Sequence, residues 1–185
     1  MRTALTTDPD AEFTALVERQ ARFAFRVAYA VLLNAHDAED AVQETFLKLF
    51  RNRGWQQADN ERAFLARVAW RVAVDLRRRF PTLPAEDVGR MGQPEFDAVS
   101  PLPGPEESLA ASDHHALVHA MIDALPEDLR IPLVLSTFED LNSREIGHVL
   151  AIPEGTVRTR LQRARQMLRQ KIETAQGQRR EVRHA

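Results

Sequence analysis

Prolines gather in the middle of this 185-residue chain and divide it in two. Six of the ten prolines and three of the seven glycines lie between residues 81 and 105, where apolar residues show no helical spacing. Proline lacks a backbone N–H, so helices cannot run through such a stretch. On either side, apolar residues recur at helical spacing, without strand alternation. The sequence therefore predicts an all-α fold of two small helical domains, residues 10–80 and 112–175, joined by a flexible Pro-rich linker, residues 81–111, and followed by a basic tail, residues 176–185.

Three helices are expected in the first block. The first is interrupted at Asn34, and Asp37 is expected to cap the second. Gly54 is expected to end the second helix, since glycine tolerates the left-handed conformation found there. Asn60 is expected to cap the third helix, and Pro81 to stop it. Each helix then carries one apolar face that must be buried.

The second block predicts a helix–turn–helix unit. One helix ends at Pro126, and the next spans residues 128–138 with Pro132 in about its first turn. Ser143 is expected to cap a short helix, residues 144–150, which a turn at residues 151–155 follows. Thr156 lies near the start of a long helix reaching about residue 172. A short helix, a tight turn and a longer basic helix are typical of DNA-binding units of this kind.

The long helix has two contrasting faces. One apolar stripe is expected to dock on the preceding short helix at Ile146, Val149 and Leu150. The opposite face combines polar side chains, which can read base edges, with cations that can hold phosphates. A merely solvated helix would pair its cations with acids, whereas residues 155–171 contain six Lys and Arg and no acid. The stripe consists of Val157, Leu161, Ala164, Leu168 and Ile172.

The charge is distributed unevenly. The net charge is −2, but residues 81–113 carry seven acids and one arginine, while residues 1–80 and residues 114–185 each carry a net charge of +2. At 28% charged residues, with no apolar run long enough to span a bilayer, no membrane role is expected. The absence of cysteine and of a leader segment suits a cytoplasmic protein. No phosphate loop or catalytic motif is visible, so neither an enzyme, nor a cofactor, nor a small-molecule substrate is expected.

Three histidines lie at the end of the linker: His114, His115 and His119. The last two are four residues apart and would share a helix face, as in some metal sites. Without a carboxylate ligand on that face, we expect an exposed polar surface and no metal.

Several segments resemble the extracytoplasmic-function (ECF) family of bacterial RNA polymerase sigma factors. Region 4 of that family is similar to LPEDLR (residues 125–130), SREI (143–146) and IPEGTVRTRLQRAR (152–165). Region 2 is similar to DAEDAVQETFLKL (37–49), and the promoter-melting segment to FLARVAWRVAVDLRRR (64–79). The segments occur in the family's order, with its linker between them.

The resemblance implies that region 2 binds the β′ clamp helices of core polymerase and opens the minus-10 element. Region 4 would read the minus-35 element and touch the β flap, and an anti-sigma factor is an expected partner. The implied polymerase contacts are Asp37, Asp40, Gln43 and Glu44. The implied minus-10 contacts are Trp55, Asn60, Arg67, Arg71, Arg77 and Arg78. The implied minus-35 contacts are Arg158, Thr159, Arg160, Gln162, Arg163, Arg165 and Gln166.

Two interpretations of Trp55, in the loop before the melting segment, stay open. Trp55 either holds an unstacked base or packs under its own loop. Asp75, the one acid in residues 67–79, is expected to pair with a neighbouring arginine and fix the helix end.

The chain departs from the family at three positions. Arg71 stands where the family usually has Asn, and Trp70 where it has Arg or Lys, which puts the usual minus-10 contacts in doubt. Gly147 stands where it usually has Ala, at a cost of up to ~1 kcal/mol in helix propensity.

Two alternatives to a sigma factor are a mimic that sequesters an anti-sigma factor and a stand-alone helix–turn–helix regulator. A mimic should lose its DNA-facing cations, and a regulator has no use for a clamp-binding helix.

Overall fold

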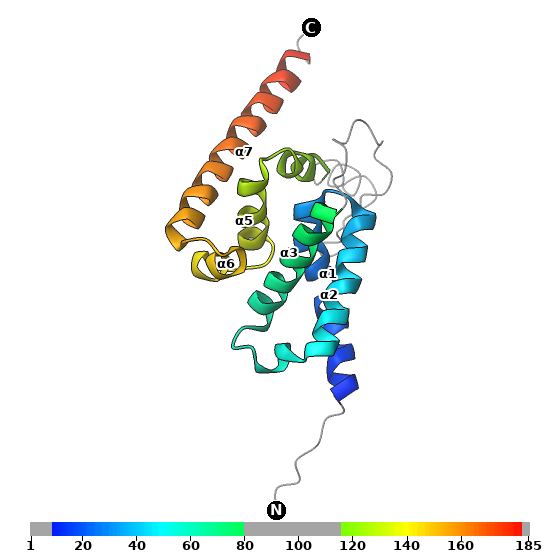
Figure 1. Ribbon diagram of the computed structural model, residues 1–185. Helices are drawn as coiled ribbons and strands as arrows, with labels where there is room; N and C mark the ends of the chain where they lie inside the picture. The colour runs from blue at the N-terminus through cyan, green and yellow to red at the C-terminus, as the bar shows by residue number, and fades with distance from the viewer. Residues whose placement is uncertain (1–8, 80–115, 183–185) are drawn as a thin grey trace, which may run out of the picture. The chain divides into compact units, whose positions relative to one another are not determined.

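The computed structural model describes residues 9–79 and 116–182, with side chains described for residues 10–79 and 116–174. Every regular element in these two ranges is a helix (Figure 1). The chain divides into two compact units, one built on α1–α3 and one built on the helices after residue 116. The all-α, two-domain prediction is confirmed. The predicted linker, residues 81–111, lies outside the described residues.

The first unit is a three-helix bundle. It consists of α1 (Pro9–Leu32), α2 (Ala35–Asn52) and α3 (Glu61–Arg79), with the short 3₁₀ helix η1 (Gly54–Gln57) between the last two. Each helix of the bundle contacts both others. Leucine, valine and alanine side chains fill most of the core. They belong to the apolar faces that the sequence predicted for the three helices. Two phenylalanines join them, and the largest buried apolar side chains of this unit are Leu16, Phe23, Phe46, Leu49 and Leu65.

The start of α2 differs from the prediction. Its N-cap is Asn34, whose Oδ1 accepts a hydrogen bond of 3.1 Å from the backbone N–H of Asp37. Asp37 therefore lies in the first turn, where its carboxylate still favours the positive end of the helix dipole. The Asn60 cap of α3 is confirmed, because its Oδ1 accepts from the N–H of Ala63 at 3.0 Å.

The end of α2 also differs. Arg53, and not Gly54, adopts the left-handed conformation, with φ 46° and ψ 14°, and its N–H donates to the carbonyl of Leu49. Gly54 instead opens η1. A non-glycine residue in this region is uncommon but tolerated when it closes a helix with such a hydrogen bond.

A polar cluster ties α1 to the start of α3. Glu61 accepts hydrogen bonds at 3.0 and 3.1 Å from Nη2 of Arg19, and one at 2.8 Å from Nε2 of Gln20. Gln20 is buried, so its amide depends on this acceptor. Next to this cluster, the guanidinium of Arg62 lies 5.1 Å from the centre of the Phe23 ring, in a cation–π contact.

The second unit contains a helical segment at residues 116–123, then α5 (Glu127–Thr137), α6 (Ser143–Leu150) and α7 (Glu154–Val182). The helix α7 packs closely on α5, a contact that the sequence did not predict. It also runs well past residue 172 and takes in much of the predicted basic tail. The segment 173–182 contains no proline, so nothing in it forces the helix to stop.

Two further predictions about α5 and α6 are wrong in detail. Pro132 is the sixth residue of α5 and lies inside the helix, not in its first turn. The cap of α6 is Asn142, and not Ser143: its Oδ1 accepts from the N–H of Glu145, whose Oε2 accepts from the N–H of Asn142. This reciprocal arrangement is a capping box with asparagine in the serine position.

Arg130 joins α5 to the helical segment before it. Its side chain is buried, and its Nη1 donates at 3.0 Å to the carbonyls of Asp123 and Leu125. These carbonyls belong to the end of a helix, where four lack partners within the helix itself. A buried guanidinium therefore supplies the cap that this helix end needs.

Candidate nucleic-acid interface

The turn between α6 and α7 positions the second helix. Ala151 is left-handed, with φ 54°, and the N–H of Ile152 donates at 3.0 Å to the carbonyl of Gly147. This is the hydrogen bond of a Schellman motif, which reverses the chain at the end of α6. Gly147 has no room for a side chain, because a Cβ there would lie 2.8 Å from the carbonyl oxygen of Ile152. The departure from the family's usual alanine thus has a local physical reason.

The apolar stripe of α7 is buried over its first half only. Val157, Leu161 and Ala164 are buried, whereas Leu168 is half-buried and Ile172 is 39% exposed. The N-terminal half of the helix is therefore fixed in orientation by its core contacts, and the C-terminal half departs from the core.

The outward face of α7 carries the predicted minus-35 residues. All are exposed except Arg160, which is half-buried. Thr159 donates its hydroxyl proton to the carbonyl of Gly155 at 3.0 Å. The residues of this face are Arg158, Thr159, Arg160, Gln162, Arg163, Arg165 and Gln166.

Two of these arginines have acid partners, contrary to the expectation of an unpaired cationic face. Arg158 forms an ion pair with Glu154, four residues earlier on α7. The Nε of Arg160 lies 3.9 Å from Oδ2 of Asp128 on α5. The sequence argument missed both acids, because one lies just before residues 155–171 and the other on a different helix.

The arginines predicted to contact the minus-10 element lie along α3. Arg67, Arg71 and Arg78 are exposed, and Arg77 is half-buried. The other side of the helix is buried in the bundle, through residues such as Leu65 and Val72. The structure therefore gives α3 a cationic outer side. The predicted ion pair of Asp75 is not found within residues 9–79.

Trp55 lies on η1 and packs inside the first unit. Its ring centre is 6.2 Å from that of Phe13, which also contacts Phe46 and Phe50 edge-on. Its Nε1 is buried and has no hydrogen-bond partner among the described residues. The packing alternative for Trp55 is therefore the arrangement observed. Asn60, predicted in the same group, has its Oδ1 engaged in capping α3.

The exposed side of α2 is mixed acidic and apolar. Asp40, Gln43 and Glu44 are exposed as predicted, and Glu44 lies 3.6 Å from Nζ of Lys48. Sequence reasoning missed Leu47, which is 49% exposed between these polar residues. Helical spacing from Gln43 and Glu44 could have revealed it. Phe50, near the end of α2, is 44% exposed. Asp37 is half-buried.

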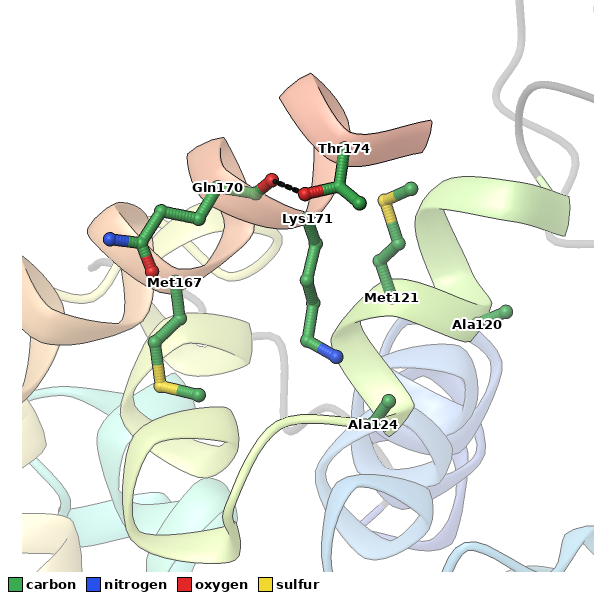
Figure 2. A pocket seen from close by; sticks show the side chains of 7 residues that line it. All are labelled: Ala120, Met121, Ala124, Met167, Gln170, Lys171 and Thr174. Atoms are coloured by element: carbon green, nitrogen blue, oxygen red, sulfur yellow. Dashed lines mark hydrogen bonds between the residues drawn. The ribbon is translucent and has the colours of Figure 1, made fainter. Parts of the chain in front are cut away.

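A shallow groove lies between residues 116–124 and the C-terminal half of α7 (Figure 2). It measures about 440 Å³, with the methionines Met121 and Met167 on opposite sides. Gln170, Lys171 and Thr174 line the α7 side, and the Thr174 hydroxyl donates to the Gln170 carbonyl at 2.9 Å. Flexible methionines suit a surface that adapts to a partner.

The histidine cluster gives no sign of a metal site in the described residues. His119 stacks on Phe138, with ring centres 6.0 Å apart. His114 and His115 lie outside the described residues. No group of potential ligands is found in the ranges that the structure describes, nor does any helix there have the length and apolar character needed to cross a membrane.

Together, a helix–turn–helix with an exposed cationic face and a separate bundle with an acidic helix face define the class of two-domain transcription initiation factors. Comparison with known protein families agrees. The Sigma-70 region 2 family matches residues 16–79, and the Sigma-70 region 4 family matches residues 115–168. The chain belongs to the ECF family of RNA polymerase sigma factors, which act as regulators of transcription.

Two curated relatives support this assignment. The chain is 35% identical over 168 residues to the ECF RNA polymerase sigma factor SigE of Mycolicibacterium smegmatis, a match that covers 88% of this chain but 64% of that protein. It is 32% identical over 155 residues to SigW of Bacillus subtilis, covering 80% and 82%.

Solved structures show the same fold. The sigma factor RpoE, crystallised with the anti-sigma factor NepR from Bartonella quintana, superimposes with a TM-score of 0.62 at 19% identity, over 88% of this chain and 97% of that one. CnrH, in complex with the cytosolic domain of CnrY, gives 0.60 at 21%, over 89% and 90%.

Proposed function

We propose that this protein directs core RNA polymerase to promoters in the cytoplasm, with residues 10–80 acting as region 2 and residues 112–175 as region 4. The observation that carries the proposal is the division of α7. Val157, Leu161 and Ala164 are buried, whereas Gln162, Arg163 and Gln166 on the other side are exposed. A helix with one face fixed in a core and a polar, cationic face outward has the form required for the major groove.

Reconstituted transcription with core polymerase on a promoter library tests this function. The parent chain should select a set of promoters, and Arg163→Ala with Arg165→Ala should lose preference at the minus-35 element. A base contact should cost ~1–3 kcal/mol and relax one position, whereas a phosphate contact should reduce the salt slope by about one unit. The same experiment separates the alternatives: a mimic supports no transcription, and a stand-alone regulator binds DNA without core polymerase.

The exposed side of α2 is the proposed contact with the β′ clamp helices. Asp40, Gln43 and Glu44 offer acidic and amide groups for basic residues of the polymerase, and Leu47 adds apolar area among them. An exposed leucine on an otherwise polar helix face has no role in the core. Polar rims around an apolar contact are the usual composition of protein interfaces.

The groove beside α7 is the proposed contact with the β flap. Its two methionines would receive an apolar side chain, and Lys171 would meet an acid at the edge. Met121→Ser and Met167→Ser should each weaken flap binding and leave promoter recognition by α7 intact. Equal flap binding by both variants and the parent would remove this assignment.

An anti-sigma factor is the proposed inhibitor. RpoE of Bartonella quintana binds the anti-sigma factor NepR, and its structure resembles this chain over both units. A partner that covers the outer sides of α2 and α7 would hide polymerase- and DNA-binding surfaces at once. A pull-down from the native cell, including its membrane fraction, should recover such a protein. Recovery of polymerase subunits alone would count against it.

A further inference from the structure

Two carboxylates flank the outward face of α7 at its N-terminal end. Glu154, the first residue of the helix, pairs with Arg158, and Asp128 of α5 lies 3.9 Å from Arg160. Arg158 and Arg160 stand about 100° to either side of Thr159 around the helix axis. Each edge of the face therefore carries one arginine that has an acid partner.

The following turns of α7 are different: Arg163 lies near the middle of the face, and Arg165 lies within about 20° of Arg158, on one edge. Arg163 and Arg165 are exposed, and neither forms an ion pair within the part of the chain that the structure describes. The four charges at the N-terminal end cancel, while the following turns are positive. The electrostatic potential at a DNA phosphate is thus least positive at the two edges of the first turns of α7. The sugar–phosphate strands that border a groove would lie there.

We infer that Glu154 and Asp128 are specificity-determining residues, which weaken the binding of α7 to DNA of arbitrary sequence more than its binding to the promoter. The inference rests on the proposed function, in which this face of α7 enters the major groove. Binding to arbitrary sequence comes almost entirely from phosphate contacts, whereas promoter binding also uses base edges. A carboxylate beside an arginine weakens the contact of that arginine with a phosphate. It does not weaken the contacts that other side chains make with base edges.

The exposure of these pairs allows the arginines to change partner. The side chains of Arg158 and Glu154 are 71% and 41% exposed, and those of Arg160 and Asp128 are 30% and 56% exposed. Ion pairs with this much access to solvent are weak. An arginine can therefore leave its carboxylate for a phosphate once base contacts hold the helix in the groove. In a loose complex on arbitrary sequence, no base contact holds the phosphate close enough for that exchange.

The test compares Asp128→Asn and Glu154→Gln with Glu173→Gln, in the full-length chain. Glu173 is an exposed acid on the same helix, far from its N-terminal end, so this control makes the same change in net charge. Fluorescence anisotropy measures how the holoenzyme that each variant forms with core polymerase binds to a promoter duplex and to a duplex of scrambled sequence, at several salt concentrations. Circular dichroism verifies that each variant is folded.

Each of the two test variants should free one arginine for a phosphate on scrambled DNA. The slope of log K against log salt should steepen there by about 0.9, so lowering salt from about 200 to about 50 mM should raise affinity about 3.5-fold more than in the parent. The slope on the promoter should stay at the parent value, because there the arginines have already exchanged partners. The ratio of promoter to scrambled affinity should therefore fall.

Either of two results would overturn the inference: variants that behave like Glu173→Gln on both duplexes, or equal gains on both duplexes. Arg163→Ala with Arg165→Ala, measured in parallel, separates this failure from that of the proposed function. If that double variant loses its promoter preference while the carboxylate variants change nothing, only the inference fails. If it keeps its preference, α7 is not the reading helix.

Discussion

The carbonyl oxygen of Ile152 occupies the space where a side chain on Gly147 would begin, since a Cβ there would lie 2.8 Å from it. Both the oxygen and the neighbouring Glu154 N, at 3.6 Å, are backbone atoms at the entry to α7, so they can yield only if that helix shifts. Gly147→Ala should therefore lower the free energy of unfolding by about 1 kcal/mol, since overpacking of about 1–3 kcal/mol exceeds the gain in helix propensity.

Gly155→Ala is the matched control, because a Cβ at Gly155 meets nothing within 4 Å. This variant should be as stable as the parent or more stable, by up to ~1 kcal/mol. Thermal denaturation followed by circular dichroism compares the two. Equal stability of the two alanine variants would show that the turn relaxes without cost.

Asp40→Ala with Glu44→Ala should weaken binding to core polymerase about tenfold, which is ~1.4 kcal/mol. Both side chains are exposed, and Glu44 pairs with Lys48 on the same helix, so stability should change by less than about 0.5 kcal/mol. Surface plasmon resonance with immobilised core measures the affinity. Glu18→Ala with Asp59→Ala, two exposed acids of the first unit outside α2, makes the same change in net charge. A test variant that binds core no less tightly than this control would contradict the clamp assignment.

Arg77→Ala with Arg78→Ala should abolish open-complex formation on duplex promoters. Opening requires a cationic track for the separated strand, and each captured base must offset a few kcal/mol of unstacking and unpairing. A template with a pre-melted bubble should restore much of the activity, because the opening cost is then removed. Permanganate footprinting gives the readout.

Because Arg77 is half-buried, Arg78→Ala alone should show the same defect in weaker form. Arg22→Ala, an exposed arginine on α1, should open promoters like the parent. Normal melting by the double variant would mean that this end of α3 is not the melting element.

Glu61→Ala should destabilise the first unit by about 1–2 kcal/mol, and Arg19→Ala by less than about 1 kcal/mol. The difference arises because removal of Glu61 also deprives the buried amide of Gln20 of its acceptor. A double-mutant cycle, measured by urea denaturation, tests this. Glu61→Ala should still lower the free energy of unfolding by most of the same amount when Arg19 is already alanine. If Glu61→Ala costs no more than Arg19→Ala, the bond to Gln20 contributes nothing.

Helical periodicity was a sound guide to the number and faces of the helices, because burial of one apolar stripe dominates helix stability. It was a poor guide to their ends. Asn34 and Asp37 can both cap, as can Asn142 and Ser143, and spacing alone does not decide which side chain reaches the free N–H groups. Arg53 takes the left-handed position beside Gly54 in a similar way: its own N–H closes the last turn of α2 on the carbonyl of Leu49, and spacing alone does not show which residue makes this bond.

The candidate site was predictable where it depended on one helix and not where it depended on two. The outward face of α7 follows from its sequence, but the pairing of Arg160 with Asp128 exists only because α5 and α7 pack together. Trp55 likewise could not be assigned from its loop, since its contact Phe13 lies more than forty residues earlier.

The packing of Trp55 gives the first unit an intrinsic optical signal. The chain has two tryptophans, Trp55 and Trp70, and both belong to residues 54–79. Indole fluorescence therefore reports on the α1–α3 unit alone, because the helix–turn–helix contains no tryptophan. With its N–H shielded beside Phe13, Trp55 should emit at shorter wavelength than a hydrated indole and shift to the red when η1 is displaced. Engagement of the first unit by a partner can thus be followed in the unlabelled protein.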